Sequence, residues 1–299
     1  MDIKYLEYLL KIEETGNMAR AAESLYLTPS ALTQMLRRVE KELGTQLFTR
    51  SRSGCEPTAA GRLVLDSARK MINERNNLLR RMDELKETCS MTLRIGYPPD
   101  RCSCMFRAVY PEFHEKYPEV QIHLKETQVT ELEHAAACGD LDLCFITHQS
   151  GLSNPALAYH SIREEELLAC IPEENCRNIP SGEKLSVISL RDLSHQRFAL
   201  PSESSTMRVW QNEIFRQAGF EPEVIFDTSR TSTILSMVQM GYCSTLLPDF
   251  YYDPELSGVR FFHLDKTPVW RLDAICEKNH YLSSPEKELI RLTRKIFHV

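Results

Sequence analysis

The stretch LTPSALTQMLRRVEKELG, residues 27–44, constrains the fold more than any other part of the chain. Thr28 can cap the N-terminus of a helix, and Pro29 suits the first helical position, where its missing N–H costs no hydrogen bond. Gly44 can end the helix. Apolar side chains recur at helical spacing and predict one buried face: Leu32, Met35, Leu36 and Val39. We therefore expect an amphipathic helix between Thr28 and Gly44.

A second helix directly precedes this one. The apolar spacing of residues 2–15 predicts a first helix that ends at Gly16, and Asn17 can cap the next helix. That second helix contains the small pair Ala21 and Ala22, which allows another helix to pack closely. Only a short turn separates it from the helix described above. Two helices joined in this way predict a helix-turn-helix.

The outer face of the third helix carries short polar groups first and cations further along: Ser30, Thr33, Gln34, Arg37 and Arg38. In a recognition helix, the N-terminal residues meet base edges and the cations meet phosphates. The solvated face of an ordinary amphipathic helix has a similar composition. The preceding helix, the tight turn and the basic segment that follows favour DNA binding.

That following segment, GTQLFTRSRSGCEPTAAG, predicts a wing. Leu47-Phe48 indicates a short strand, and residues 50–54 indicate a basic turn that can reach the DNA backbone or minor groove. The recognition helix and the wing together give the expected DNA contacts: Thr28, Pro29, Ser30, Thr33, Gln34, Arg37, Arg38, Arg50 and Arg52.

A long helix over residues 59–88 follows, with Thr58 as its cap. Its apolar side holds Leu63, Leu65, Met71, Ile72, Leu78, Leu79, Met82 and Leu85. A helix of this length spans about 45 Å and cannot bury such a stripe by itself. Pairing with a second copy is the simplest solution, so we expect a homodimer through residues 59–88.

The net charge of −6 is unusual for a nucleic-acid binder until the chain is divided. Residues 28–62 hold six basic residues against three acidic ones, and the acidic excess lies after residue 90. A locally basic segment in an acidic protein is typical of a small DNA-binding head on a larger body.

One set of residues in the head has a specific spacing: Leu6, Gly16-Asn17, Ala21-Ala22, Leu25, Ala31-Leu32-Thr33, Arg37-Arg38-Val39-Glu40, Leu43-Gly44, Leu47-Phe48-Thr49-Arg50 and Thr58-Ala59-Ala60-Gly61. In this set, residues 1–62 resemble the winged helix-turn-helix of LysR-type transcriptional regulators. The resemblance implies a DNA-binding regulator that forms a dimer or tetramer on a pseudo-palindromic operator and contacts RNA polymerase.

The chain departs from the family pattern at three positions. Asn17 stands where the family usually has Ser, Pro57 stands where it usually has Leu, and Pro29-Ser30 stands where it often has Gln-Pro. Both Asn and Ser can cap a helix. The change at Pro29 removes an amide suited to reading adenine and leaves the operator sequence open.

The remaining two hundred residues contain the same pattern twice. Strand, helix, strand, helix and strand are expected within residues 91–147, and again within residues 196–248. Each half should form a small, mostly parallel sheet with covering helices. Crossing strands are expected near 156–164 and 267–275, and the last helix should return to the first lobe. The resemblance implies a two-lobed, periplasmic-binding-protein-like effector domain.

The expected fold is therefore mixed α/β in four parts. Residues 1–62 form the winged helix-turn-helix, and residues 63–90 form the linker and dimerisation helix. Residues 91–162 with 268–299 form effector subdomain I, and residues 163–267 form subdomain II.

Ligands of open α/β sheets bind beyond the carboxyl ends of the strands. The loops there are rich in hydroxyls and precede helix N-termini, which suits a small anionic or amino-acid-like effector. The candidate contacts are Pro99, Asp100, Arg101, Cys102, Ser103, Thr127, Gln128, Thr130, Thr147, Ser202, Ser204, Ser205, Thr206 and Thr228.

Each of these candidates has a simpler alternative role. Most of the Ser, Thr and Asp side chains could be helix caps only. Asp100 could cap a helix or meet an amine on the ligand. Arg101 could bind a carboxylate or be a solvated residue of a first helical turn.

The cysteines suggest no metal site. The chain has ten cysteines but no CxxC pair, so we expect reduced thiols, no metal and no cofactor. Cys102 and Cys104 could form a redox sensor at a helix N-terminus, although positions i and i+2 point apart in a helix. The peroxide-sensing members of the resembled family carry their cysteines in the second lobe, where this chain has none between Cys176 and Cys243.

Other classes of protein remain as alternatives. No apolar run is long enough to span a membrane, and the acidic start MDIKYLEYLLKIEE is unlike an export signal, so we expect a cytoplasmic protein. An enzyme would need a catalytic constellation, and no GxSxG, Walker A loop or GxGxxG is present, so we expect no enzymatic activity. A regulator that responds without any small-molecule ligand stays open.

Overall fold

The structure is a computed structural model that describes residues 2–51, 54–84, 91–99, 101–149, 151, 153–176, 185–266 and 270–297, without the side chains of 50, 51, 83 and 84. Several predictions therefore lie outside the described residues: the side chain of Arg50, Arg52, Asp100, the end of the long helix and residues 267–269. The chain divides into two compact units, Met1–Thr88 and Cys89–Val299, each described by itself.

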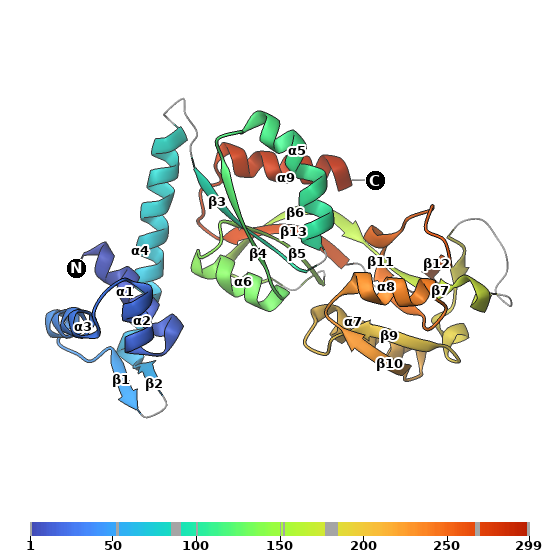
Figure 1. The fold of residues 1–299 in the computed structure, drawn as a ribbon, viewed down its shortest axis with the longest axis horizontal. Helices are drawn as coiled ribbons and strands as arrows, with labels where there is room; N and C mark the ends of the chain where they lie inside the picture. The colour runs from blue at the N-terminus through green and yellow to red at the C-terminus, as the bar shows by residue number, and fades with distance from the viewer. Residues whose placement is uncertain are drawn as a thin grey trace. The chain divides into compact units, whose positions relative to one another are not determined.

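The first unit, the head, consists of four helices and a hairpin (Figure 1). The elements are α1 (Ile3–Thr15), α2 (Met18–Ser24), α3 (Pro29–Leu43), β1 (Phe48–Ser51), β2 (Gly54–Pro57) and α4 (Ala59–Glu84). The predicted caps are confirmed. The Asn17 side chain accepts a hydrogen bond from the Ala19 N–H at 2.8 Å, and Thr28 Oγ1 accepts one from the Ala31 N–H at 3.2 Å. Gly44 ends α3 in the left-handed region, at φ 68°.

The hairpin of the head is held against α3 and α4. Glu40 on α3 accepts a hydrogen bond from the Leu47 N–H at 2.8 Å, which fixes the start of the wing. A Cβ on Gly61 would lie 2.0 Å from the Leu47 carbonyl oxygen, so only glycine allows α4 to approach this closely. Arg50 lies within β1, opposite Cys55, which corrects the prediction that residues 50–54 form one turn. Strand β1 extends to Ser51 and β2 begins at Gly54, because the main chains of these two strands pair with each other up to that point.

Helix α4 begins after Thr58, whose Oγ1 accepts a hydrogen bond from the Gly61 N–H at 2.9 Å. Arg69 pairs with Glu13, and Arg75 pairs with Glu7 at 3.3 Å, so α4 is tied to α1. Much of the predicted apolar stripe is not covered by the head itself. The exposed large apolar residues of α4 are Leu63, Met71, Leu78, Leu79 and Met82.

The second unit, the body, begins with lobe I, a five-stranded sheet with helices on both faces (Figure 1). The strand order is β4 (Gln121–Glu126), β3 (Thr92–Tyr97), β5 (Leu143–Gln149), β13 (Trp270–Glu277) and β6 (Leu157–Glu165). The strands β4, β3 and β5 are parallel, whereas β13 is antiparallel to both of its neighbours. The helices are α5 (Arg107–Lys116), preceded by a π-helical turn (Cys102–Phe106), α6 (Val129–Cys138) and α9 (Ser284–Phe297).

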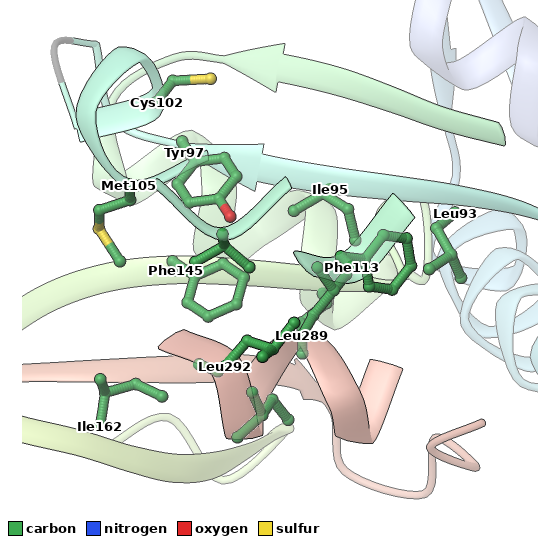
Figure 2. Close-up of a cluster of buried hydrophobic side chains, with 14 of the residues drawn as sticks. Leu93, Ile95, Tyr97, Cys102, Met105, Phe113, Phe145, Ile162, Leu289 and Leu292 are labelled. Carbon is green, nitrogen blue, oxygen red and sulfur yellow. The ribbon is translucent and has the colours of Figure 1, made fainter. Parts of the chain in front are cut away.

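Alternate residues of the strands in lobe I face two separate cores. Phe145 packs beneath α5 and α9, stacked on Tyr97 with ring centroids 5.0 Å apart (Figure 2). Its neighbours Cys144 and Ile146 face α6. Because both faces of β5 are covered, its residues 143–146 form a continuous apolar run in the sequence. Helix α9 lies beside α5, so the end of the chain returns to lobe I as predicted.

Lobe II is built around the four-stranded sheet β11 (Thr245–Pro248), β7 (Leu167–Pro172), β12 (Val259–Leu264) and β8 (Val187–Ile188). The parallel pair β9 (Arg197–Pro201) and β10 (Glu223–Thr228) adjoins it through a bridge between Phe198 and Ser244. Helix α7 (Thr206–Ala218) packs on one face and α8 (Thr231–Gln239) on the other. Short 3-10 turns occur at Glu173–Cys176, Leu190–Leu193 and Asp249–Tyr251.

The prediction for lobe II was incomplete. Strands β7, β8 and β12 lie outside the expected strand-helix pattern, and β7 is antiparallel to both of its neighbours, so the sheet is not mostly parallel. Strand β7 comes directly after the crossing strand β6, and β12 comes directly before the crossing strand β13. An antiparallel partner can therefore be reached without a crossover helix.

None of the helices in the described part of the chain is both long and apolar enough to cross a membrane.

Candidate functional site

The outward face of α3 is polar and lies opposite the buried stripe Leu32, Met35, Leu36 and Val39. Ser30, Gln34 and Arg37 are exposed, and Thr33 is half-buried. Thr28 and Pro29 at the start of α3 are also exposed, and Thr28 Oγ1 lies 3.0 Å from Ser30 Oγ. The periodicity of the helix thus leaves these predicted side chains on one accessible surface.

The cations of α3 are directed to solvent rather than into ion pairs. Within the described ranges, neither Arg37 nor Arg38 forms a salt bridge, and both are exposed. Arg38 donates a hydrogen bond to the Tyr5 hydroxyl at 3.4 Å and lies 5.9 Å from the centre of that ring. An exposed cation without an acidic partner is available to a phosphate. Arg50 and Arg52 of the wing complete the predicted set but lie outside the described side chains.

The loops at the carboxyl ends of the strands in the body meet in a narrow space between the lobes, here called the inter-lobe gap. Its cavity volume is about 60 Å³. It is lined by Pro98, Pro99, Arg101, Gln128, Val129, Thr147, Pro201, Ser205, Thr206, Met207, Ser229, Thr231, Tyr251 and Trp270. The first residues of α6, α7 and α8 are all in this set, so three helix N-termini converge there.

Six of the predicted effector contacts line the gap: Pro99, Arg101, Gln128, Thr147, Ser205 and Thr206. Seven lie away from it: Cys102, Ser103, Thr127, Thr130, Ser202, Ser204 and Thr228. Local bonds account for some of these. Thr127 donates a hydrogen bond to Glu131, and Thr228 Oγ1 accepts one from the Arg230 N–H at 3.2 Å. Asp100 lies outside the described residues.

Arg101 is engaged by a buried acid. Its Nη1 and Nη2 atoms donate to the two carboxylate oxygens of Glu165 at 2.9 and 2.6 Å, and both side chains are almost fully buried. Its guanidinium also lies 4.7 Å from the centre of the Phe250 ring. Arg163 pairs with Asp249 and lies 3.8 Å from Glu165. The start of the π-helical turn before α5, the end of β6 and the turn after β11 are therefore joined by one charge network.

Trp270 was missed as a site residue, although it lies at the start of a predicted crossing strand. It is 1% exposed and stacks edge-on against Trp210 of α7, with centroids 4.4 Å apart. Its indole N–H has no hydrogen-bond partner among the described residues. Tryptophan in an apolar run gives no sequence signal that separates a core residue from a ligand contact.

A second cavity, here called the side pocket, opens beside the gap and shares Val129, Thr206 and Trp270 with it. Its volume is about 390 Å³. The other lining residues are Glu133, His148, Gln149, Ser153, Asn154, Tyr159, Val209 and Trp210. A cavity of this size is in the range of small-molecule sites, whereas the gap holds only a few atoms.

Among the described residues, three titratable side chains line the side pocket: Glu133, His148 and Tyr159. His148 Nε2 is 2.8 Å from an oxygen of Asp273, and its Nδ1 is 3.1 Å from the Gln149 carbonyl oxygen. Burial raises the pKa of Glu133 above its usual value, and the nearby His148 ring offsets part of that shift. Among the described residues, no cluster of three or more His, Cys, Asp or Glu is arranged to hold a metal ion.

Cys102 is buried and belongs to the hydrophobic cluster of lobe I (Figure 2), and it is not among the residues that line the gap. Burial raises its pKa to about 11, with a further contribution from the charge of Glu126. A thiol with so high a pKa is a poor nucleophile at neutral pH. This environment argues against a sensing role for the Cys102 and Cys104 pair.

Family profiles cover most of the chain. Residues 3–62 match the bacterial regulatory helix-turn-helix protein, lysR family. Residues 87–297 match the LysR substrate binding domain. The two profiles divide the sequence close to the boundary between head and body.

Relatives and solved structures agree with these profiles. The uncharacterized HTH-type transcriptional regulator YcgK of Bacillus subtilis (strain 168) is 27% identical over 99% of this chain and 94% of its own. The HTH-type transcriptional regulator XapR of Escherichia coli (strain K12) is 25% identical over 98% of each chain. These relatives are transcriptional regulators and not enzymes.

The fold is shared with structures of full-length regulators. A full-length OxyR variant from Pseudomonas aeruginosa has a TM-score of 0.73 at 18% identity, with 98% of both chains covered. Full-length CbnR complexed with its target DNA has a TM-score of 0.58 at 19% identity, with 99% of both chains covered. The winged helix-turn-helix, the two-lobed body and the family matches lead to one conclusion: this chain belongs to the LysR family of DNA-binding transcriptional regulators.

Proposed function

We propose that the protein binds a pseudo-palindromic operator as a dimer and changes its geometry on DNA when a small effector enters between the lobes. The outward face of α3 is the observation that carries the DNA-binding part. Ser30, Thr33 and Gln34 stand at its N-terminal end, where base edges are read, and Arg37 and Arg38 follow, where phosphates lie. Arg50 and Arg52 of the wing add backbone or minor-groove contacts.

Dimerisation through α4 is supported by its uncovered apolar stripe. Leu63 is 72% exposed and Leu78 is 57% exposed, and Met71 and Met82 lie on the same helical face. An isolated head would leave this face in water, and a second copy of α4 would bury it. Two heads would then present two recognition helices to two half-sites. A tetramer and contact with RNA polymerase follow from family membership and are part of the proposal.

The effector part of the proposal places a small anionic or amino-acid-like ligand in the inter-lobe gap. The main-chain N–H groups at the starts of α6, α7 and α8 and the hydroxyls of Thr147, Ser205 and Thr206 support it. The charge of Arg101 is already neutralised by Glu165, so a carboxylate would depend on these neutral donors. Because the gap is nearly closed, a ligand would have to move the lobes apart and shift the population of quaternary states.

The DNA-binding surface is tested by replacing Arg37 and Arg38 together with alanine. The operator is first selected from random duplex DNA by the wild-type protein, and affinity is measured by fluorescence anisotropy over a range of salt. We expect affinity to fall and the salt slope to decrease by about two, because two phosphate contacts are lost. The control removes two exposed cations of the body, Arg107 and Lys125, by alanine substitution.

Equal losses in both double variants would mean that net charge, and not the face of α3, controls binding. The effector part is tested separately, by footprinting the operator complex with and without candidate ligands. A ligand that binds the body and changes the protected region supports the proposal. A panel in which no bound ligand changes the footprint contradicts it.

A further inference from the structure

The side pocket has a volume suited to a small molecule, whereas the inter-lobe gap is too small for one. Its volume is about 390 Å³, against about 60 Å³ for the gap, and the two share Val129, Thr206 and Trp270. A ligand that enters between the lobes therefore has space for its body on this side. Lobe I contributes α6, β5 and β6 to the walls, and lobe II contributes α7, so an occupant would touch both lobes.

The walls of the side pocket are aromatic. Trp210 and Trp270 meet edge to face, with ring centroids 4.4 Å apart. Tyr159 of β6 also lines the side pocket, with its ring 5.2 Å from that of His148. Aromatic faces carry partial negative charge, so they favour a ring or a cation placed against them.

The charge of the side pocket is negative. Glu133 is a half-buried carboxylate, and no described residue donates a hydrogen bond to it. His148 is already paired with the Asp273 carboxylate, 2.8 Å from its Nε2, so it offsets the charge of Glu133 only in part. No lysine or arginine is among the residues that line this pocket. An anion that carries no cationic group would meet repulsion here, whereas an ammonium group would find a partner.

A second polar group in the wall of the side pocket lacks a hydrogen-bond partner. The Trp270 indole N–H is buried and has no partner within the described ranges. A buried donor without an acceptor costs free energy, which an acceptor on a bound molecule would recover. Glu133 thus requires a cation that donates a hydrogen bond, whereas the Trp270 indole N–H requires an oxygen that accepts one.

We propose that the side pocket binds a small aromatic amine, with its ammonium group on Glu133, its ring against Trp210, Trp270 and Tyr159, and an oxygen acceptor on the Trp270 indole. This inference rests on the proposed function, since it assigns a ligand class to the same inter-lobe region. It moves the body of the effector out of the gap and narrows the anionic or amino-acid-like class to molecules that carry an amine.

The test is isothermal titration calorimetry on the full chain with four phenyl probes that differ in their charged groups. The probes are phenethylamine, L-phenylalanine, phenylacetate and 2-phenylethanol. We expect the two amines to bind and phenylacetate not to bind. L-Phenylalanine should bind more tightly than phenethylamine, because it alone of the two amines carries an oxygen acceptor for Trp270.

Variants locate the site. Glu133→Gln keeps the shape and removes the charge, so it should weaken both amines by about tenfold or more. Glu131→Gln is the matched control on the same helix and should leave both affinities unchanged. Trp270→Phe removes the N–H and keeps a ring, so it should weaken L-phenylalanine more than phenethylamine. Circular dichroism confirms that each variant is folded.

The outcomes separate this inference from the proposed function. If phenylacetate binds and Glu133→Gln has no effect, the amine assignment is wrong, although an effector still binds between the lobes. If none of the four probes binds at millimolar concentration, the amine assignment is also wrong, and footprinting with other ligands decides the proposed function. If the amines bind through Glu133 but leave the operator footprint unchanged, the side pocket is an amine-binding site, but the proposed effector role is wrong.

Discussion

The outer face of α3 and the inter-lobe gap both gather polar side chains at helix N-termini, yet they use their cations in opposite ways. Arg37 and Arg38 extend from a helix whose other face is buried, and among the described residues neither meets an acid. Arg101 stands at the start of a helix as well, but it is buried against Glu165. A cation is available to a ligand only where packing leaves it no acidic partner, and that condition depends on tertiary structure.

The largest expected effect comes from Arg101→Leu. Removing one partner of a buried ion pair leaves Glu165 charged and desolvated, which costs about 3–5 kcal/mol of unfolding free energy. The neighbouring Arg163, 3.8 Å from Glu165, offsets part of this cost, so we expect the lower end of the range. Urea denaturation followed by circular dichroism measures the loss. The Arg37 and Arg38 alanine double variant should lose DNA affinity with little change in stability.

The comparison is sharpened by removing both partners. Arg101→Leu with Glu165→Leu takes away the unpaired charge, so it should recover much of the lost stability. If Arg101→Leu alone leaves stability unchanged but weakens effector binding, Arg101 serves a ligand after all, and the contrast with α3 disappears.

The sequence predicts the head well because its signals are local. Thr28, Pro29 and Gly44 fix the ends of α3 within a few residues, and the buried stripe follows from helical periodicity alone. The repeated strand-helix pattern of the body is also local, and its elements occur where expected. The exposed side of a helix follows from the same pattern, so the candidate DNA contacts could be named in advance.

The site between the lobes depends on contacts between distant segments, which no local pattern encodes. Glu165 follows Arg101 by 64 residues, and their pairing turns a candidate ligand contact into a structural bridge. Trp270 joins Trp210 from a different lobe. Strand β7 takes its place in lobe II through antiparallel pairing with β11 and β12, which lie far along the chain.

A smaller effect compares the same substitution in both regions. Thr28 and Ser205 each cap a helix, and their hydroxyls accept hydrogen bonds from main-chain N–H groups at 3.2 Å. Alanine at either position should cost about 1 kcal/mol. Thr28→Ser and Ser205→Thr keep the acceptor oxygen and serve as controls. Denaturant unfolding of the full chain, read separately for each unit, measures both changes.

Equal losses would show that the two hydroxyls are caps first, whatever else they contact. If Ser205→Ala costs no stability, its hydroxyl is not needed by α7 and is available to a ligand in the gap. In that case the polar side chains of the gap, like those of the outer face of α3, would be available to a ligand.

The smallest effect concerns acid stability in the body, where α9 is joined to α5 by ion pairs. Arg291 donates two hydrogen bonds to Glu288 at 2.7 and 3.0 Å, and Lys116 of α5 lies 3.2 Å away. The Arg291 guanidinium, followed by Lys116, lowers the pKa of Glu288 to about 2, from its usual value near 4.5. A carboxylate with a lowered pKa stabilises the fold above its unfolded pKa and loses this contribution as the pH falls from about 4.5 towards 2.

Glu288→Gln should therefore lower the melting temperature of the body at pH 7 by at most roughly 2–4 °C, since ion pairs near the surface contribute little. The difference from wild type should narrow as the pH falls below about 4.5. Differential scanning calorimetry between pH 3.5 and 7 measures it, with the exposed Glu119→Gln as a control expected to follow wild type throughout. A difference that stays constant over this range would mean that Glu288 acts through packing and hydrogen bonds that its neutral form also makes. In that case the charge of Glu288 would contribute as little to the stability of the body as the charge of an exposed residue. The outer face of α3 and the body would then differ more in the pairing of their cations than in their response to acid.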